Sequence, residues 1–156
     1  MSLVQGINHV AILTADLERF IHFYVGHFGM EVVFREETPA FAHAILRNGP
    51  SSWLHPVALA GNAHSSALPD MFTRGHLDHL ALGVPSAEAF EQVRIRLVEA
   101  GASSGVIEDL GAMHTLWFTD PDGMKGELCL IVDPELRTFH APRPLEDLSH
   151  TATGLA

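Results

Sequence analysis

A short apolar motif with a central histidine occurs twice in this chain. The sequence reads INHVAI at residues 7–12 and LDHLAL at residues 77–82, so His9 and His79 hold the same place in the two runs, 70 residues apart. A polar turn and then a helix-like pattern follow each run. A repeat has to be recognised before single elements are assigned, because it sets the architecture. We therefore expect two copies of one module that begins with a strand and a helix.

Hydrophobic periodicity predicts the order strand, helix and three strands in each module. The first module, residues 6–60, is predicted as a strand at 6–13, a helix at 16–28 that Gly29 ends, and strands near 30–35, 41–46 and 53–60. The second module, residues 76–132, is predicted as a strand at 77–84, a helix that begins after Ser86 and ends at Gly101, and strands near 103–108, 113–119 and 126–132. The fold class is thus α+β, with both modules in a single domain over residues 1–132.

Two further segments lack clear periodicity. Residues 61–75 are rich in small and polar residues and are predicted to link the modules. Residues 133–156 contain scattered prolines, and an irregular C-terminal tail is expected there.

Composition excludes several classes of partner. The formal charge is −10 with only nine Lys and Arg residues and no basic cluster, which argues against a nucleic-acid partner. No apolar stretch approaches the ~20 residues that cross a membrane. The single cysteine, Cys129, excludes an internal disulfide and suits a reducing compartment. We expect a cytoplasmic protein with neither a membrane nor a nucleic acid as partner.

Strand alternation places three candidate metal ligands on strand faces that carry small or apolar neighbours. His9 shares a face with Ala11, and His79 shares one with Ala81. Glu127 lies in the last predicted strand, where a carboxylate among apolar residues is costly unless a cation or hydrogen-bond donors compensate it. If the first and last strands of the two modules meet at one cleft, two histidines and one glutamate form a facial triad, which favours Fe(II) with open positions.

His55 is a candidate fourth ligand. An offset of 72 residues aligns Gly29 with Gly101, and the same offset places His55 opposite Glu127 in the repeat. A slip of one residue in this alignment would turn the side chain to the other face of the strand. Both placements of His55 therefore stay open at this point.

Other aromatic and histidine side chains have a structural and a functional interpretation. His114 is either a proton-transfer group at the cleft or a solvated strand histidine. Trp117 is either a core aromatic or a wall of the substrate pocket. The remaining histidines have no support from the repeat and are predicted to lie on the surface; they are His22, His27, His43, His64, His76, His140 and His150.

The chain resembles the vicinal oxygen chelate superfamily, which includes glyoxalase I, extradiol dioxygenases, methylmalonyl-CoA epimerase and the fosfomycin and bleomycin resistance proteins. The resemblance covers roughly residues 6–132 and rests on Asn8-His9-Val10, Phe23-Tyr24, Phe28-Gly29-Met30, Asp78-His79-Leu80 and Asp120-Pro121-Asp122-Gly123 with Glu127. It implies paired βαβββ modules that form an open, curved barrel around a divalent metal, often in dimers. It also implies His9, His79 and Glu127 as metal ligands, with the fourth family position at or near His55.

The resemblance leaves several activities open. Glyoxalase I usually has a glutamate at the position of His55, and extradiol dioxygenases have a tyrosine at the position of Trp117. We expect a metal-dependent enzyme, in the first place a single-domain extradiol-type dioxygenase that acts on a small catecholic or similar substrate with Fe(II) or Mn(II). The alternatives are a glyoxalase I-like lyase or isomerase with nickel, zinc or cobalt, and a metal-free drug-binding resistance protein. A homodimer is expected in each case.

Overall fold

The computed structural model describes residues 7–50, 52–62, 77, 79–135, 138–146 and 148. Its internal contacts divide the chain into two compact units. The first unit comprises Met1–Leu68 with Pro121–Gly123, and the second comprises Pro69–Asp120 with Met124–Ala156. Most of the predicted linker at 61–75 lies outside the described residues.

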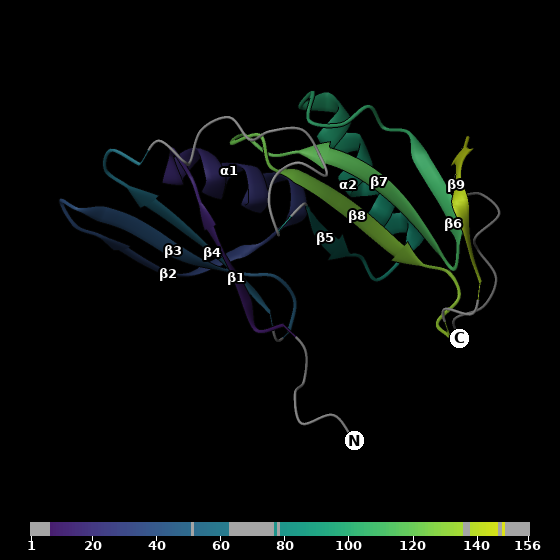
Figure 1. Cartoon of the computed structure of the whole chain (residues 1–156), viewed down its shortest axis with the longest axis horizontal. Coiled ribbons are helices and arrows are strands. Elements are labelled where there is room, and N and C mark those ends of the chain that lie inside the picture. The colour runs from purple at the N-terminus through teal and green to yellow at the C-terminus, as the bar shows by residue number, and fades with distance from the viewer. Residues whose placement is uncertain are drawn as a thin grey trace, which may run out of the picture. The chain divides into compact units, whose positions relative to one another are not determined.

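The first unit contains a four-stranded sheet and one helix (Figure 1). Its elements are β1 (His9–Leu13), α1 (Leu17–Phe28), β2 (Glu31–Glu37), β3 (Phe41–Arg47) and β4 (Trp53–Leu59). The strand order is β1-β4-β3-β2, with β1 parallel to β4 and the other pairs antiparallel. The predicted order of strand, helix and three strands is confirmed for this module.

Local signals fix both ends of α1, and one face of the helix is buried. The Asp16 side chain accepts a hydrogen bond from the Arg19 backbone N–H, which satisfies a donor that the first turn leaves open. Gly29 ends the helix with φ at 68°, a conformation that favours glycine. The buried side chains of α1 belong to Leu17, Phe20, Phe23 and Tyr24.

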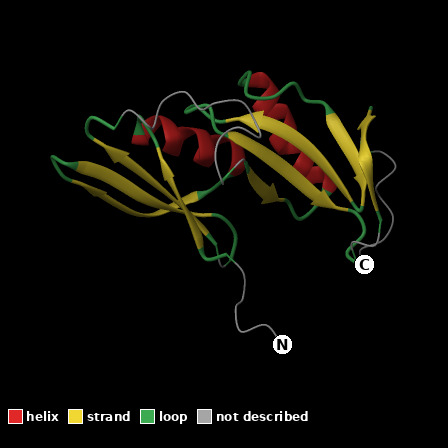
Figure 2. Cartoon of the chain, in the orientation of Figure 1, coloured by secondary structure: helices red, strands yellow, loops and turns green. Residues whose placement is uncertain are grey.

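The second unit repeats this plan and adds a strand, as the strands and helices of Figure 2 show. Its elements are β5 (Leu80–Gly83), α2 (Ala87–Glu99), β6 (Ile107–Gly111), β7 (Met113–Thr119), β8 (Lys125–Ile131) and β9 (Phe139–Leu145). The strand order is β5-β8-β7-β6-β9, with β5 parallel to β8. Ser86 caps α2 as predicted. The α+β class and the two βαβββ modules are confirmed.

The expectation of an irregular tail over residues 133–156 is wrong for residues 139–145. These residues form β9, which pairs antiparallel with β6 at the edge of the sheet. Pro142 and Pro144 argue against a strand at the sequence level, because proline cannot donate a hydrogen bond to a neighbouring strand. An edge strand tolerates them, since one side of its backbone has no strand partner among the described residues.

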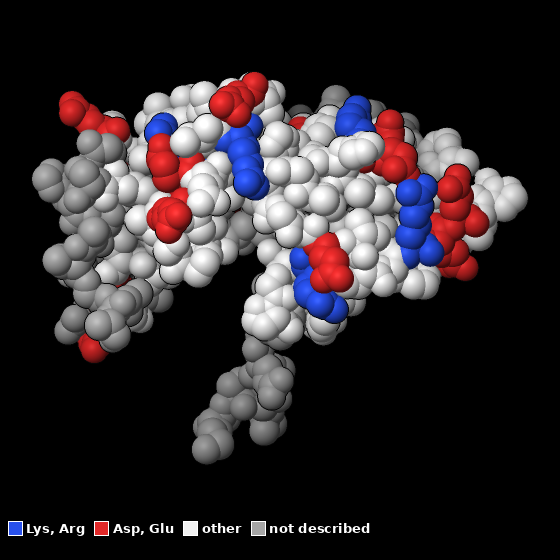
Figure 3. Space-filling view, turned by 180° about the vertical axis from the view of Figure 1, so that it is seen from behind, with Lys and Arg blue, Asp and Glu red and all other residues white. Residues whose placement is uncertain are grey.

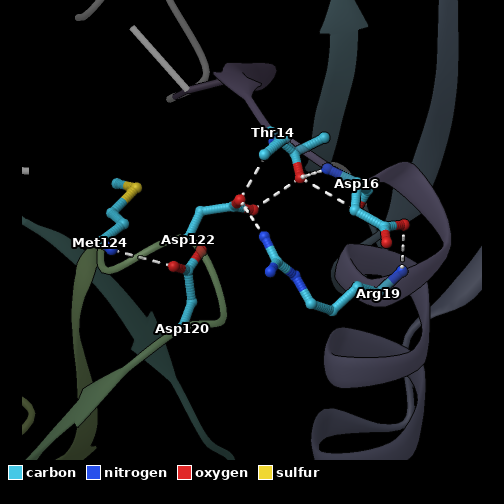
Figure 4. A network of polar contacts seen from close by, with 7 residues as sticks. Thr14, Asp16, Arg19, Asp120, Asp122 and Met124 are labelled. Atoms are coloured by element: carbon cyan, nitrogen blue, oxygen red, sulfur yellow. Dashed lines mark hydrogen bonds and ion pairs between the residues drawn. The ribbon is translucent and has the colours of Figure 1, made fainter. Parts of the chain in front are cut away.

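The turn between β7 and β8 holds a buried carboxylate that three donors satisfy (Figure 4). Asp122 accepts hydrogen bonds from the Thr14 hydroxyl at 2.6 Å, from the Ala15 backbone N–H at 3.0 Å and from the Arg19 guanidinium at 2.5 Å. The Asp122 side chain is 5% exposed, whereas that of Arg19 is 46% exposed. A buried charge needs such partners, so the Asp-Pro-Asp-Gly motif has a structural role here.

Neither helix of the described residues has the length or the apolar character that a membrane span requires. On the face drawn in Figure 3, the Lys and Arg side chains are dispersed, and they lie beside Asp and Glu side chains. Among the described residues, Arg47 pairs with Glu31 at 3.1 Å and Arg94 pairs with Glu91 at 2.5 Å. The basic side chains drawn in Figure 3 do not gather into a patch.

Candidate metal centre

The first unit places two candidate ligands side by side on one face of its sheet. His9 and Ala11 lie on one face of β1, and Ala11 is opposite His55 in the parallel pair of β1 and β4. The two imidazole rings are 5.9 Å apart between centroids and meet edge to face. The neighbours Leu54 and Ile12 point the other way and are buried. The register therefore puts His55 on the same face as His9.

A neighbouring amide favours a tautomer of His9 that leaves the Nε2 atom free to bind a metal. The Nδ1 atom of His9 lies 2.9 Å from the Oδ1 atom of Asn8. An amide oxygen only accepts, so Nδ1 carries the hydrogen and donates it. The Nε2 atom of His9 then carries the lone pair, an arrangement that is common in metal-bound histidines.

The local environment keeps His55 in its neutral form. Burial lowers the pKa of His55, and the nearby His43 and His9 lower this pKa further. A ligand imidazole has to be neutral to offer a lone pair. The shift therefore favours the state in which His55 could bind a cation near neutral pH.

The second unit brings His79 and Glu127 together. The parallel pairing of β5 and β8 places Ala81 opposite Glu127, so His79 is a diagonal neighbour of Glu127 on the same face. The His79 Nε2 atom lies 3.7 Å from the Glu127 Oε2 atom. Glu127 is only 8% exposed. A buried carboxylate with an imidazole at this distance is suited to hold a cation.

Cys129 lies next to Glu127 on the same face of β8 and does not act as a thiolate. Burial raises the pKa of the Cys129 thiol to about 12, and the charge of Glu127 and a hydrogen bond to Glu127 contribute to the shift. The protonated thiol donates this hydrogen bond to the carboxylate. Cys129 therefore supports Glu127 and is unsuited to nucleophilic chemistry at neutral pH.

The donor chemistry of the two pairs fits a divalent metal ion. Nitrogen and oxygen ligands each lie ~2.1 Å from such an ion, so atoms up to ~4 Å apart can share one. The 3.7 Å between His79 and Glu127 falls within that limit. Within residues 7–50, 52–62, 79–135 and 138–146, no group of three or more His, Cys, Asp or Glu side chains lies close enough to hold an ion. The four candidate ligands thus occur as two pairs, one in each unit.

Trp117 stands beside the ligand pair of the second unit. It is the cross-strand partner of Glu127, and its ring lies 4.9 Å from the His79 ring in an edge-to-face contact. Its indole N–H donates to the Glu108 carboxylate at 3.2 Å, which fixes the ring. Trp117 is half-buried beside His79, and its place in the wall of a substrate pocket stays a prediction.

Within the second unit, His114 does not lie on the face that carries His79 and Glu127. His114 pairs with Leu130, whereas Trp117 pairs with Glu127, so alternation puts His114 on the opposite face of the sheet. The side chain is buried, and burial lowers the pKa of His114. The expectation of a solvated strand histidine is therefore wrong, because this face carries the core of the unit.

His43 is a site residue that the sequence analysis missed. It was predicted to lie on the surface, but it is half-buried in β3 and forms hydrogen bonds with His55 and Glu36. The alternation of β3 could have placed it on the ligand face, yet no repeat or motif marks it. Of the other histidines assigned to the surface, His22 is exposed, His27 and His140 are half-buried, and His64, His76 and His150 lie outside the described residues.

Comparison with known proteins identifies the family. Residues 6–128 match the model of the Glyoxalase/Bleomycin resistance protein/Dioxygenase superfamily. A glyoxalase family protein from Enterococcus faecalis is 26% identical with a TM-score of 0.64, over 82% of this chain and 99% of that one. The trypanothione-dependent glyoxalase I of Leishmania major is 25% identical with a TM-score of 0.57, over 80% and 86%.

A third similar structure is that of a metal-bound relative. The fosfomycin resistance protein FosX from Listeria monocytogenes, in complex with Mn(II) and sulfate, has a TM-score of 0.58 over 82% of this chain and 93% of that one. At 15% identity this likeness concerns the fold alone. The match of the family model, together with the repeated module in sequence and structure, shows that the chain belongs to the Glyoxalase/Bleomycin resistance protein/Dioxygenase superfamily, the vicinal oxygen chelate proteins.

Proposed function

We propose that this protein is a divalent-metal-dependent enzyme that binds a small substrate through two neighbouring oxygen atoms. The observation that carries the proposal is the pair of ligand sets, His9 with His55 in the first unit and His79 with Glu127 in the second. Within each unit, the register of the parallel strand pair puts the two members of a set on one face of the sheet. Membership of the superfamily, whose name includes glyoxalases and dioxygenases, agrees with this proposal.

His9, His55, His79 and Glu127 would hold the ion. When bound, the metal acts as a Lewis acid and as a template that orients the substrate oxygens. The imidazoles would supply lone pairs, and the Glu127 carboxylate would supply the negative charge that a divalent cation requires. The protonated Cys129 thiol donates to Glu127 and helps to orient it. Trp117, held by Glu108, would form one wall of the substrate site.

The position of His55 favours a lyase or isomerase of the glyoxalase kind over an extradiol dioxygenase. A facial triad leaves positions open for both substrate and dioxygen. With His55 beside His9, four protein ligands would leave fewer positions open than a facial triad does, and these would suit a substrate that binds through two neighbouring oxygen atoms. This choice departs from the dioxygenase that the sequence analysis expected first, and the similarity to a glyoxalase I agrees with it.

Metal content after loading tests the proposal directly. The full chain is stripped with a chelator, incubated with Mn²⁺ or Ni²⁺, desalted and measured by elemental mass spectrometry. We expect near-stoichiometric metal in the wild type and its loss in His79→Ala, because removal of one ligand of a small set weakens binding strongly. His22→Ala, at an exposed position of α1, serves as the control. Full metal content in His79→Ala would overturn the ligand assignment.

Oxygen consumption separates the reaction classes. A lyase or isomerase turns over its substrate without dioxygen, whereas uptake of dioxygen with a catechol by the Fe(II)-loaded protein would restore the dioxygenase hypothesis. A wild-type chain that takes up no metal under any loading condition would instead favour a metal-free binding protein.

A further inference from the structure

A row of three polar side chains crosses the sheet of the first unit and ends at His55. Glu36 on β2 and His43 on β3 are direct cross-strand partners. His43 is opposite Val57 on β4, so His55 is its diagonal neighbour on the same face. The His43 Nε2 atom lies 2.9 Å from the Glu36 Oε2 atom, and the His43 Nδ1 atom lies 2.8 Å from the His55 Nε2 atom. Both ring nitrogens of His43 are therefore engaged.

The chemistry of the row fixes the direction of its hydrogen bonds. An ionised carboxylate only accepts, so the Nε2 atom of His43 carries a hydrogen and donates it to Glu36. A neutral imidazole has a single N–H, and the Nδ1 atom of His43 is then an acceptor. The Nε2 atom of His55 must donate to it. The only lone pair left on the His55 ring is that of Nδ1.

We propose that Glu36 and His43 are positioning residues that hold His55 in its Nε2–H tautomer, so that His55 binds the metal through Nδ1. The consequence for the metal rests on the proposed function, whereas the tautomer itself does not. His9 has the opposite arrangement, because Asn8 engages its Nδ1 atom. The two histidines of the first unit would thus bind by different nitrogens, His9 by Nε2 and His55 by Nδ1.

Aromatic neighbours support the orientation of His43. The rings of Phe34 and Phe41 lie 5.4 Å and 5.1 Å from the His43 ring between centroids. The His43 side chain is only 17% exposed, whereas that of Glu36 is 51% exposed. His43 is therefore the fixed link of the row, and Glu36 is its solvent-facing end.

The tautomer can be measured in the metal-free full chain by long-range ¹H–¹⁵N correlation spectra of the histidine side chains. The His55 signals are assigned from the spectrum of His55→Asn. We expect the Nε2–H tautomer for both His55 and His43. In His43→Phe, His55 loses its acceptor and becomes a mixture of tautomers. The matched control, His22→Phe, leaves the His55 signals unchanged.

A second variant keeps the test informative if His43→Phe does not fold. Glu36→Ala removes only the exposed end of the row, and we expect it to shift the tautomers of His43 and His55. Glu37→Ala, at the next residue of β2, is its control. A wild-type His55 in the Nδ1–H tautomer, or His55 signals that neither variant changes, would overturn the proposal.

The metal readout uses calorimetric titration with Mn²⁺ alone. Loss of an outer residue that orients a ligand weakens metal binding by about 10- to 100-fold, and we expect this loss in His43→Phe but not in His22→Phe. Equal affinity in His43→Phe and the wild type would refute the positioning role. If the wild type binds no metal while its His55 tautomer is as assigned, the proposed function fails and the tautomer assignment stands.

Discussion

Two buried threonines differ in whether the side-chain hydroxyl has a hydrogen-bond partner. The Thr14 hydroxyl donates to the Asp122 carboxylate at 2.6 Å. Thr115 is fully buried on β7, and its hydroxyl has no hydrogen-bond partner among the described residues. A buried polar group without a partner costs stability, whereas a hydrogen bond to a charged group contributes to it. The same substitution should therefore have opposite effects at the two positions.

We expect Thr115→Val to raise the free energy of unfolding by about 1 kcal/mol, and Thr14→Val to lower it by about 2 kcal/mol. Urea denaturation followed by circular dichroism measures both changes. The two variants control for each other, because the chemical change is identical. A destabilised Thr115→Val would mean that the hydroxyl has a partner, such as an ordered water or a bound substrate.

The faces of single residues could be predicted from the sequence only where alternation and the repeat act together. In a strand, successive side chains point to opposite faces. This alternation puts His9 on the face opposite the buried Ile12, and Glu127 on the face opposite the buried Leu128. His43 has no such support, because its significance arises from pairing with Glu36 across the sheet. Cross-strand register depends on the whole sheet and cannot be predicted from the local alternation of residues.

At the scale of elements, two glycines show how packing decides the effect of one added methyl group. Gly126 on β8 is the cross-strand partner of Phe118, and a Cβ atom built on Gly126 would lie 2.0 Å from the Phe118 ring. Phe118 is almost fully buried, and core side chains are closely packed. Gly26 lies inside α1, and a Cβ atom there would meet nothing within 4 Å.

We expect Gly126→Ala to lower the free energy of unfolding by about 1 to 3 kcal/mol, because added volume in a packed core forces its neighbours to move. Gly26→Ala should raise it by up to about 1 kcal/mol, since alanine has the higher helix propensity. Thermal or urea melts of the two variants test this contrast. An unchanged Gly126→Ala would show that β7 and β8 can separate at this point without cost.

Most elements could be predicted from the sequence because their signals are local. The caps Asp16 and Ser86 and the terminator Gly29 mark helix ends by side-chain and backbone preferences that need no tertiary contact. β9 could not be predicted in this way, because its prolines mask a strand that exists only through its pairing with β6. β6 also begins later than predicted, at Ile107, after Gly105 in a left-handed conformation.

At the scale of the whole molecule, the repeat predicts two modules of one design, and the family match over residues 6–128 agrees with it. The reaction class could not be predicted in the same way. It depends on the number of metal ligands and on the substrate, and the face on which His55 lies is fixed only by the register of β1 with β4. The candidate ligands are divided between the two units, so one ion that binds to all four would need the whole chain.

Hydrogen exchange with and without Mn²⁺ tests this joint action. A ligand that binds the folded state at 100 times its Kd stabilises it by about 2.7 kcal/mol, and amides that exchange by opening the site are slowed accordingly. We expect slower exchange in β1 and β4 of the first unit and in β5 and β8 of the second, because each unit supplies two ligands. His79→Ala should abolish the effect in both units, although it alters only the second. Slowing that is confined to β1 and β4 and survives in His79→Ala would instead mean that the first unit holds the ion by itself. The exchange pattern therefore distinguishes a site that needs the whole molecule from one that needs a single module.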